Sequence, residues 1–145
     1  MKKIIIVIGL ALLFSNVALA SGSVIGKWKT IDDSTGEVKS IVEITKKNNK
    51  LYGTIVQLFN EDPNYDPVCT ECKGDLNGKR ILGLQIINGL TYDSGRWTGD
   101  KGILDPDNGK VYDVRLWVDD EDNDKLNVRG YIAFLYRTQT WIREK

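Results

Sequence analysis

Gly26-Lys27-Trp28, inside an apparent strand at residues 24–31, and Arg137-Thr138-Gln139-Thr140-Trp141-Ile142-Arg143, close to the last residue, are the two stretches that say most about the fold. Both are rich in β-branched and aromatic residues, which favour strands. A sheet with unpaired first and last strands offers open edges to other chains, and closing the sheet into a barrel removes those edges. The two stretches therefore predict a small β-barrel whose last strand pairs with its first.

The chain between these stretches predicts strands throughout. After residue 20 it shows no apolar period of 3.6 residues, and short β-rich runs alternate with turn residues instead. Asn88-Gly89 is a strong signal for a two-residue hairpin turn, and residues 105–109 predict another turn. Eight to ten strands in meander order predict an all-β fold, a single antiparallel up-and-down β-barrel. The expected strands are 24–31, 37–45, 51–59, 80–87, 90–92, 95–97, 101–104, 110–118, 125–132 and 135–143.

The first twenty residues predict a cleavable signal peptide. A short positive start is followed by an apolar run at residues 4–14 and by Ala18-Leu19-Ala20, a small-residue cleavage pattern. A membrane anchor is the alternative, but the run is shorter than the roughly 20 residues that a spanning helix needs. We therefore expect residues 21–145 to form the barrel domain, without an integral membrane span, in the periplasm or outside the cell.

Composition excludes several functional classes. Without Lys2 and Lys3, 18 basic residues remain against 20 acidic residues, a net charge of −2, which gives no electrostatic footprint for nucleic acid. The chain contains no histidine, which removes Ser-His and Cys-His nucleophile pairs and every His-based metal site. We expect no cofactor and no metal.

Residues 61–78 interrupt the strand rhythm and contain both cysteines, Cys69 and Cys72. Long loops in compact domains tend to be functional or anchored. In an oxidising compartment the two cysteines predict a disulfide that holds the local shape of the loop. A redox centre and half of a zinc site are the alternatives. The flanks read as loop rather than as a helix N-terminus, and no further Cys or His could complete a zinc site.

Two resemblances add to this interpretation. Gly26-x-Trp28 with Arg143 resembles the lipocalin and calycin pattern, which implies that Trp28 lies across the base of the barrel and that Arg143 packs over it. Nearly all of residues 21–145 also resembles a family of small exported bacterial proteins of unknown function, which implies an exported lipocalin-like barrel and no known reaction. The residues that carry the second resemblance are Gly26-Lys27-Trp28, 32–36, Cys69-Thr70-Glu71-Cys72-Lys73-Gly74, Ile81-Leu82-Gly83, 103–106, Asn108-Gly109, Tyr112, Arg129-Gly130-Tyr131, 137–141 and Arg143.

Arg129 and Tyr131 are the first candidates for ligand binding. They lie two apart in a strand and therefore share one face. If that face is the interior, the guanidinium could hold an anionic head group, as a similar Arg-x-Tyr does in fatty-acid-binding barrels, with Arg137, Gln139 and Arg115 joining from adjacent strands. The other interpretation places the alternate residues inside, namely Leu126, Val128, Gly130 and Ile132.

The sequence thus predicts an exported, non-catalytic binding protein whose barrel lumen holds a small, largely apolar ligand with an anionic head group. One alternative is a filled barrel that acts as an interaction module for an envelope protein, through Trp97, Trp117 and Tyr136. A hydrolase that uses inward carboxylates such as Asp113 and Glu43 is a remote alternative.

Overall fold

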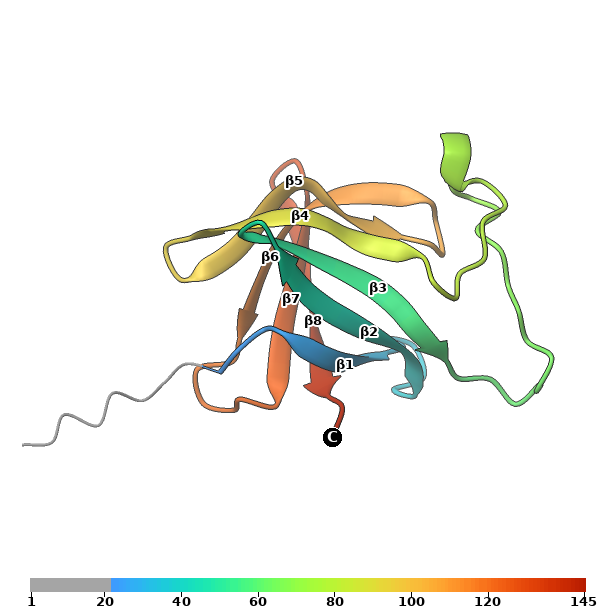
Figure 1. Cartoon of the computed structure of the whole chain (residues 1–145), viewed down its shortest axis with the longest axis horizontal. Coiled ribbons are helices and arrows are strands. Elements are labelled where there is room, and N and C mark those ends of the chain that lie inside the picture. Colours follow the sequence, from blue (N-terminus) through green and yellow to red (C-terminus); the bar gives the residue numbers. More distant parts are fainter. Residues whose placement is uncertain (1–21) are drawn as a thin grey trace, which may run out of the picture.

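The computed structural model describes residues 22–145, so the predicted signal peptide lies outside the described residues. Within this range the chain forms one closed antiparallel barrel in which each strand pairs with the next in sequence (Figure 1). The predicted all-β up-and-down barrel is confirmed, with eight strands. They are β1 (Gly26–Ile31), β2 (Val38–Lys47), β3 (Lys50–Leu58), β4 (Gln85–Asp93), β5 (Arg96–Asp105), β6 (Lys110–Val118), β7 (Lys125–Ile132) and β8 (Leu135–Arg143).

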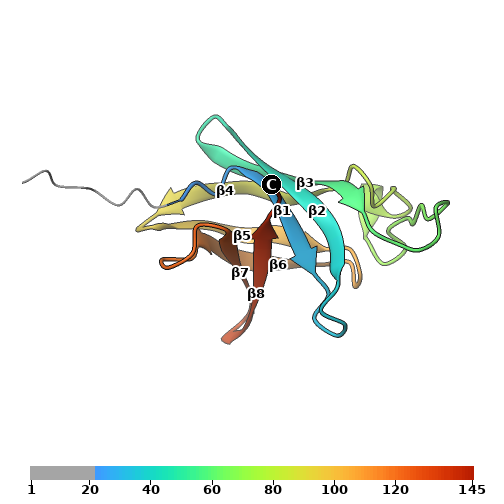
Figure 2. The same ribbon diagram turned by 90° about the horizontal axis from the view of Figure 1, so that it is seen from below.

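The last strand closes the barrel on the first, as the two terminal stretches predict. Trp28 of β1 is the register partner of Arg143 of β8, and Lys29 is the partner of Ile142. Figure 2 shows β1 and β8 side by side near the C-terminus. Within the described residues these two partners are the whole of the β1–β8 ladder, whereas β7 and β8 pair along their full length. Backbone pairing therefore closes the gap between β1 and β8 at one end of these strands only.

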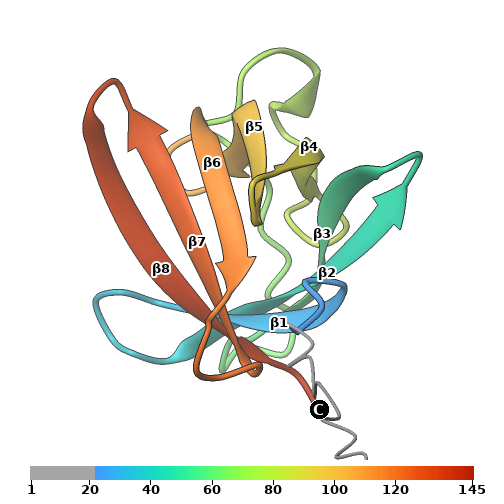
Figure 3. The same cartoon turned by 90° about the vertical axis from the view of Figure 1, so that its left-hand side faces the viewer.

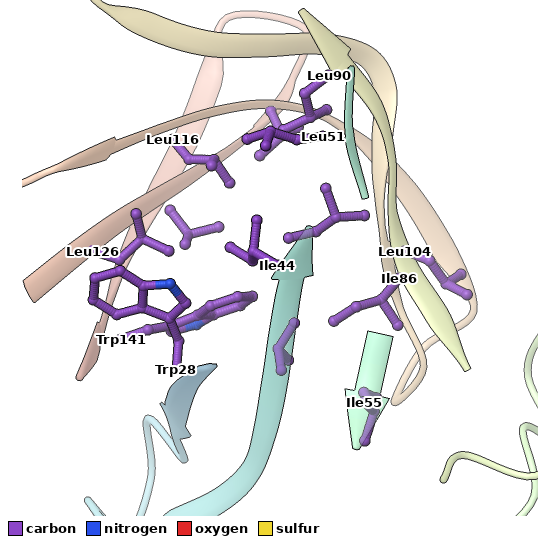
Figure 4. Close-up of a cluster of buried hydrophobic side chains, with 14 of the residues drawn as sticks. Trp28, Ile44, Leu51, Ile55, Ile86, Leu90, Leu104, Leu116, Leu126 and Trp141 are labelled. Atoms are coloured by element: carbon purple, nitrogen blue, oxygen red, sulfur yellow. The ribbon is translucent and has the colours of Figure 1, made fainter. Parts of the chain in front are cut away.

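Trp28 closes that end, which we call the base. Its side chain is fully buried, and its indole Nε1 donates to the carbonyl of Val24 at 2.9 Å. The Arg143 guanidinium lies 4.1 Å from the centre of the indole ring. Its NH2 group also donates to the carbonyls of Ser23 and Asn123, each at 2.9 Å. Figure 4 shows Trp28 beside Trp141 and Leu126, so the base is packed with large apolar side chains.

The hairpin predicted at Asn88-Gly89 is wrong, because both residues lie inside the continuous strand β4. The register against β3 shifts at this point, since Leu51 partners Leu90 while Tyr52 partners Asn88. Gly89 has a φ of 68°, a value that glycine adopts without a Cβ penalty. The glycine therefore forms a β-bulge that bends the strand, and the chain reverses later, at Ser94 and Gly95.

The strand predicted at residues 80–87 is also partly wrong, because β4 begins only at Gln85. Residues 59–84 form the long β3–β4 loop, which carries a short 3-10 helix at Gly74–Leu76 (η1) and projects from the barrel in Figures 1 and 2. A disulfide joins Cys69 and Cys72, and both cysteines are buried. The Cys69 N–H donates to the carbonyl of Lys79 at 2.7 Å. The bridge thus shapes the loop, as the sequence predicts.

Candidate functional site

A cavity of about 710 Å³ opens at the end of the barrel opposite the base. Its walls are the end of β1, the start of β2, and the matching ends of the other strands, with the β3–β4 loop at its rim. Figure 4 shows three of its apolar wall residues, Ile55, Ile86 and Leu104, set apart from Trp28. The barrel is therefore packed at the base and hollow at the mouth. Its buried apolar wall consists of Ile55, Ile86, Leu104, Val128 and Trp141.

One side of the mouth is polar. Arg137 NH2 lies 2.5 Å from Asp33 Oδ2, and Gln139 Nε2 donates to the same oxygen at 2.8 Å. Trp141 Nε1 in turn donates to Gln139 Oε1 at 3.3 Å. Arg137, Gln139 and Trp141 all line the cavity, because alternate residues of β8 share one face. The Arg137 guanidinium is thus held at the rim by the Asp33 carboxylate.

Asp33 and Arg137 also span the open part of the seam between β1 and β8. The ladder between these strands stops at Lys29 and Ile142, so farther from the base the strands are joined by side chains instead of by backbone. A carboxylate–guanidinium contact between exposed groups contributes little to stability. The Asp33–Arg137 contact therefore holds this side of the mouth only weakly.

The other side of the mouth is held by the β5–β6 turn. Tyr112 of β6 accepts a hydrogen bond at its hydroxyl from Asn108 Nδ2 at 2.8 Å. Lys39 of β2 forms an ion pair with Asp107 across the rim. Deeper in the wall, the buried Ser40 hydroxyl is satisfied by Thr30 Oγ1 at 2.7 Å. These contacts tie β1, β2 and β6 together around the opening.

The structure divides the four predicted ligand-binding residues between two faces. Arg115 is the register partner of Arg129, and Val114 is the partner of Gly130. Partners in an antiparallel pair point to the same side, so the buried Val114 places Gly130 inside and Arg115, Arg129 and Tyr131 outside. The prediction of one interior head-group site is therefore corrected. Of the four residues only Arg137 lines the cavity, because it is the register partner of the inward-facing Gly130 and points to the same side.

Arg115, Arg129 and Tyr131 belong instead to an outer wall, which we define as the outward face of β5 to β8. The Arg129 guanidinium lies 5.2 Å from the Trp117 ring and 4.5 Å from the Tyr136 ring. Arg96 covers the same Trp117 at 4.5 Å, and Arg115 lies 5.5 Å from the Tyr131 ring. Cations stacked on aromatic faces stabilise a sheet surface. Trp97 and Trp117 are half-buried, whereas Tyr136 is exposed.

The sequence did not predict the roles of several residues at the mouth. Asp33 lies in a turn that has an ordinary composition, and nothing in the sequence pairs it with Arg137. Tyr112 lines the cavity, and the role of its hydroxyl at the rim was not predicted. The alternation of Arg137, Gln139 and the buried Trp141 was the one available signal, since a buried tryptophan marks the inward face.

Asp32 holds the turn at the rim through its side chain, and the pKa of its carboxyl is lowered. Its Oδ1 accepts hydrogen bonds from the N–H groups of Thr35 at 2.9 Å and Ser34 at 2.8 Å. These backbone donors, that of Thr35 first, lower the pKa of the Asp32 carboxyl below its ordinary value of 3.8. The ionised carboxylate therefore stabilises the folded state above that value, and this contribution is lost as the pH falls through the lower folded pKa.

We expect Asp32→Ala to lower the melting temperature at neutral pH and to flatten its fall in acid. The alanine variant has no carboxylate to protonate, so the acid-dependent part that Asp32 contributes disappears. Thermal unfolding followed by circular dichroism from about pH 7 to pH 2 measures both effects, because the contribution starts to be lost near the unfolded-state pKa of about 3.9 and is lost completely only below the lowered folded pKa. Asp100→Ala, at an exposed position of β5, is the control. An unchanged acid slope in Asp32→Ala would contradict the assignment.

Two general features can be stated for residues 22–145. No group of three or more Cys, Asp or Glu side chains is arranged to hold a metal ion there. No helix in that range is long and apolar enough to cross a membrane.

A closed eight-stranded barrel, packed around Trp28 at one end and hollow at the other, defines the chain as a lipocalin-like barrel protein. It is similar in structure to protein HP1028 from the human pathogen Helicobacter pylori, which is described as belonging to the lipocalin family. The TM-score is 0.70, with 86% of this chain and 85% of that chain covered and 19% of residues identical. At this identity the likeness shows the fold alone.

Residues 26–143 match the model of a family described as uncharacterized protein conserved in bacteria (DUF2147). Because the match spans most of the chain, the protein belongs to this family. The resemblance to a bacterial family of unknown function is thereby confirmed. No curated protein matches the sequence.

Proposed function

We propose that this protein is a non-catalytic binding protein that holds a small, largely apolar molecule in the barrel cavity, with the anionic head group of the molecule at Arg137. The observation that carries the proposal is the cavity of about 710 Å³, in which a patch of apolar side chains lies within a polar rim that carries one arginine. Ligand sites in proteins are typically concavities of a few hundred Å³ or more, with mostly apolar walls and a few polar groups that fix orientation. The hollow mouth argues against a completely filled barrel.

The walls suit the body of such a ligand. Ile55, Ile86 and Leu104 come from three different strands and line the cavity. They are already almost fully buried, so the apolar surface removed from water on binding would be mainly that of the ligand, which contributes about 25 cal/mol per Å². The buried Trp141 forms the floor between the cavity and the base.

The rim suits the head group. Asp33 already occupies Arg137 with a carboxylate at 2.5 Å, which is the contact that an anionic ligand would make. A ligand carboxylate or phosphate could replace Asp33 or share the guanidinium fork, and Gln139 Nε2 offers a further donor beside it. Arg115 and Arg129 have no part in this site, because they lie on the outer wall.

We place this function in the periplasm or outside the cell. The predicted signal peptide at residues 1–20 supports export, and the disulfide between Cys69 and Cys72 suits an oxidising compartment. Such a protein would carry or store its ligand outside the cytoplasm. An envelope protein that delivers or receives the ligand would be its partner.

The proposal can be tested with an anionic fluorescent fatty acid analogue and its neutral methyl ester. We expect the purified protein to bind both, and we expect Arg137→Gln to weaken binding of the acid about tenfold, since a charge-assisted hydrogen bond contributes about 1.5–3 kcal/mol. The same variant should leave affinity for the ester unchanged, because the ester carries no charge. Fluorescence titration gives both dissociation constants.

Arg115→Gln is the matched control, because Arg115 is an exposed arginine of the outer wall. Ile86→Trp, which fills the cavity from β4, should abolish binding of both probes. If neither probe binds, or if Arg115→Gln weakens the acid as much as Arg137→Gln, the proposed site is wrong. Native mass spectrometry of the protein from a bacterial envelope fraction, before and after denaturation, would then show whether it carries any other small molecule.

A further inference from the structure

The tip of the β7–β8 hairpin is the most exposed apolar segment that the structure describes. Ile132 and Leu135 form the last register pair, and Ala133 and Phe134 make the two-residue turn. The exposed fractions are 88% for Phe134, 65% for Leu135 and 53% for Ile132. Ala133 has a φ of 52°, a left-handed conformation that is unfavourable for a residue with a Cβ, so the turn carries backbone strain. Figure 3 shows the hairpin projecting from the body of the barrel.

The residues behind the tip follow a definite order. Tyr131 and Tyr136 form the next register pair, with ring centres 5.9 Å apart. Arg129 and Arg137 come after them, one on each face of the hairpin. Along the hairpin the sequence therefore passes from aliphatic and phenyl groups through tyrosines to guanidinium groups.

This order matches the layers of a membrane surface. Apolar side chains enter the acyl region, tyrosine rings favour the interface, and arginines meet the phosphates of the head groups. Arg129 precedes Ala133 by four residues, which is about 13 Å along a strand that rises about 3.3 Å per residue. Insertion to a depth of roughly 5–10 Å would thus leave the guanidinium at head-group level.

We propose that the β7–β8 hairpin tip docks this protein on a lipid surface that carries anionic head groups, with Ile132, Phe134 and Leu135 inserted and Arg129 at the phosphates. The tip is a narrow projection. A fluid bilayer can close around such a projection. The inference stands on the hairpin alone and does not depend on the proposed ligand in the cavity.

Charge complementarity supports an anionic surface. Among the ion pairs of residues 22–145, none involves Arg96, Arg115 or Arg129, and these three cations cover the outer wall behind the tip. Acidic groups are also present, and each basic residue near an anionic membrane contributes only about 1 kcal/mol, so the apolar tip must supply part of the affinity. The acidic groups beside these arginines are Asp93, Asp100 and Asp113, around a second depression that Arg96 and Arg115 also line.

Co-sedimentation with vesicles tests the proposal. The full-length sequence, purified after any processing by its host, is mixed with vesicles of phosphatidylglycerol and phosphatidylethanolamine and, separately, of phosphatidylcholine alone. We expect binding to the anionic vesicles that weakens with added salt. Phe134→Ser with Leu135→Ser should lower the partition coefficient at least about tenfold, because two of the three side chains that enter the acyl region are lost.

Tyr92→Ser is the matched control, because Tyr92 is an aromatic residue of the β4–β5 hairpin with an exposed fraction of 63%. It should leave vesicle binding unchanged. Phe134→Trp gives a second readout, since its fluorescence should shift to the blue with anionic vesicles and be quenched by lipids brominated on the acyl chain. Absence of binding by the unaltered protein, or equal binding by the Phe134/Leu135 double variant, would overturn the proposal. A concentration-dependent dimer that only this double variant abolishes, without vesicle binding, would assign the tip to a second copy of the chain instead.

Discussion

Replacement of Trp28 by alanine is expected to lower the free energy of unfolding by about 3–5 kcal/mol, the usual cost of deleting a large buried aromatic group. Trp28 has no exposed surface and packs at the base with Trp141 and Leu126. Its loss also leaves the carbonyl of Val24 without its indole donor and the Arg143 guanidinium without the ring beneath it. A domain of this size has a stability of only about 5–15 kcal/mol, so the variant should be close to unfolding.

Urea unfolding followed by circular dichroism, with the disulfide intact, measures this change. Tyr92→Ala is the control, because it removes an aromatic ring that is mostly in solvent and should cost under about 0.5 kcal/mol. Arg143→Met tests the other half of the contact and should fall between them. It keeps apolar cover over the indole, but it removes the donors to Ser23 and Asn123. A cost below about 1 kcal/mol for Trp28→Ala would show that the base does not hold the barrel closed.

The base was also the part of the fold that the sequence predicted best. The resemblance of Gly26-x-Trp28 and Arg143 to the lipocalin pattern implied the contact between the two ends of the sequence, and the closed meander follows from the edge problem of any open sheet. Strand alternation left two interpretations for β7, and the buried Leu126 and Val128 show that the inward face is the one without Arg129 and Tyr131.

The mouth could not be predicted in the same way. Arg129 and Arg137 have the same chemistry and lie on neighbouring strands, yet one faces the outer wall and the other the cavity. The faces on which they lie depend on the register of β7 against β8, which is set by the two-residue turn at Ala133 and Phe134. Ala133 has a positive φ, and an alanine in the sequence gives no sign of that conformation. A shift of β8 by one residue against β7 would have turned Arg137 to the outer wall as well. Asn88-Gly89 failed for a related reason, because the same positive φ serves a bulge as well as a hairpin.

Gly109→Ala is expected to release the β3–β4 loop from the barrel. Gly109 closes the β5–β6 turn with a φ of +70°, and a Cβ there would lie 1.9 Å from the carbonyl oxygen of Glu71 and 2.9 Å from the N of Cys72. Both contacts are with backbone, so no side-chain rotation can relieve them. The disulfide between Cys69 and Cys72 keeps this part of the loop from moving away locally. The whole loop must therefore lift from the turn, which exposes the rim of the cavity beneath it.

Gly36→Ala separates this clash from ordinary backbone strain, because Gly36 has a similar φ of +74° in an open turn with nothing within 4 Å of the added Cβ. We expect about 1–2 kcal/mol for Gly36→Ala, the cost of a left-handed alanine, and at least about 2 kcal/mol more for Gly109→Ala. Hydrogen exchange should show the difference directly. The N–H of Cys69, which donates to Lys79, and that of Ile81, which donates to Pro67, should lose protection only in Gly109→Ala. Equal protection in the two variants would mean that the loop is held by its own hydrogen bonds and not by its seat on the β5–β6 turn.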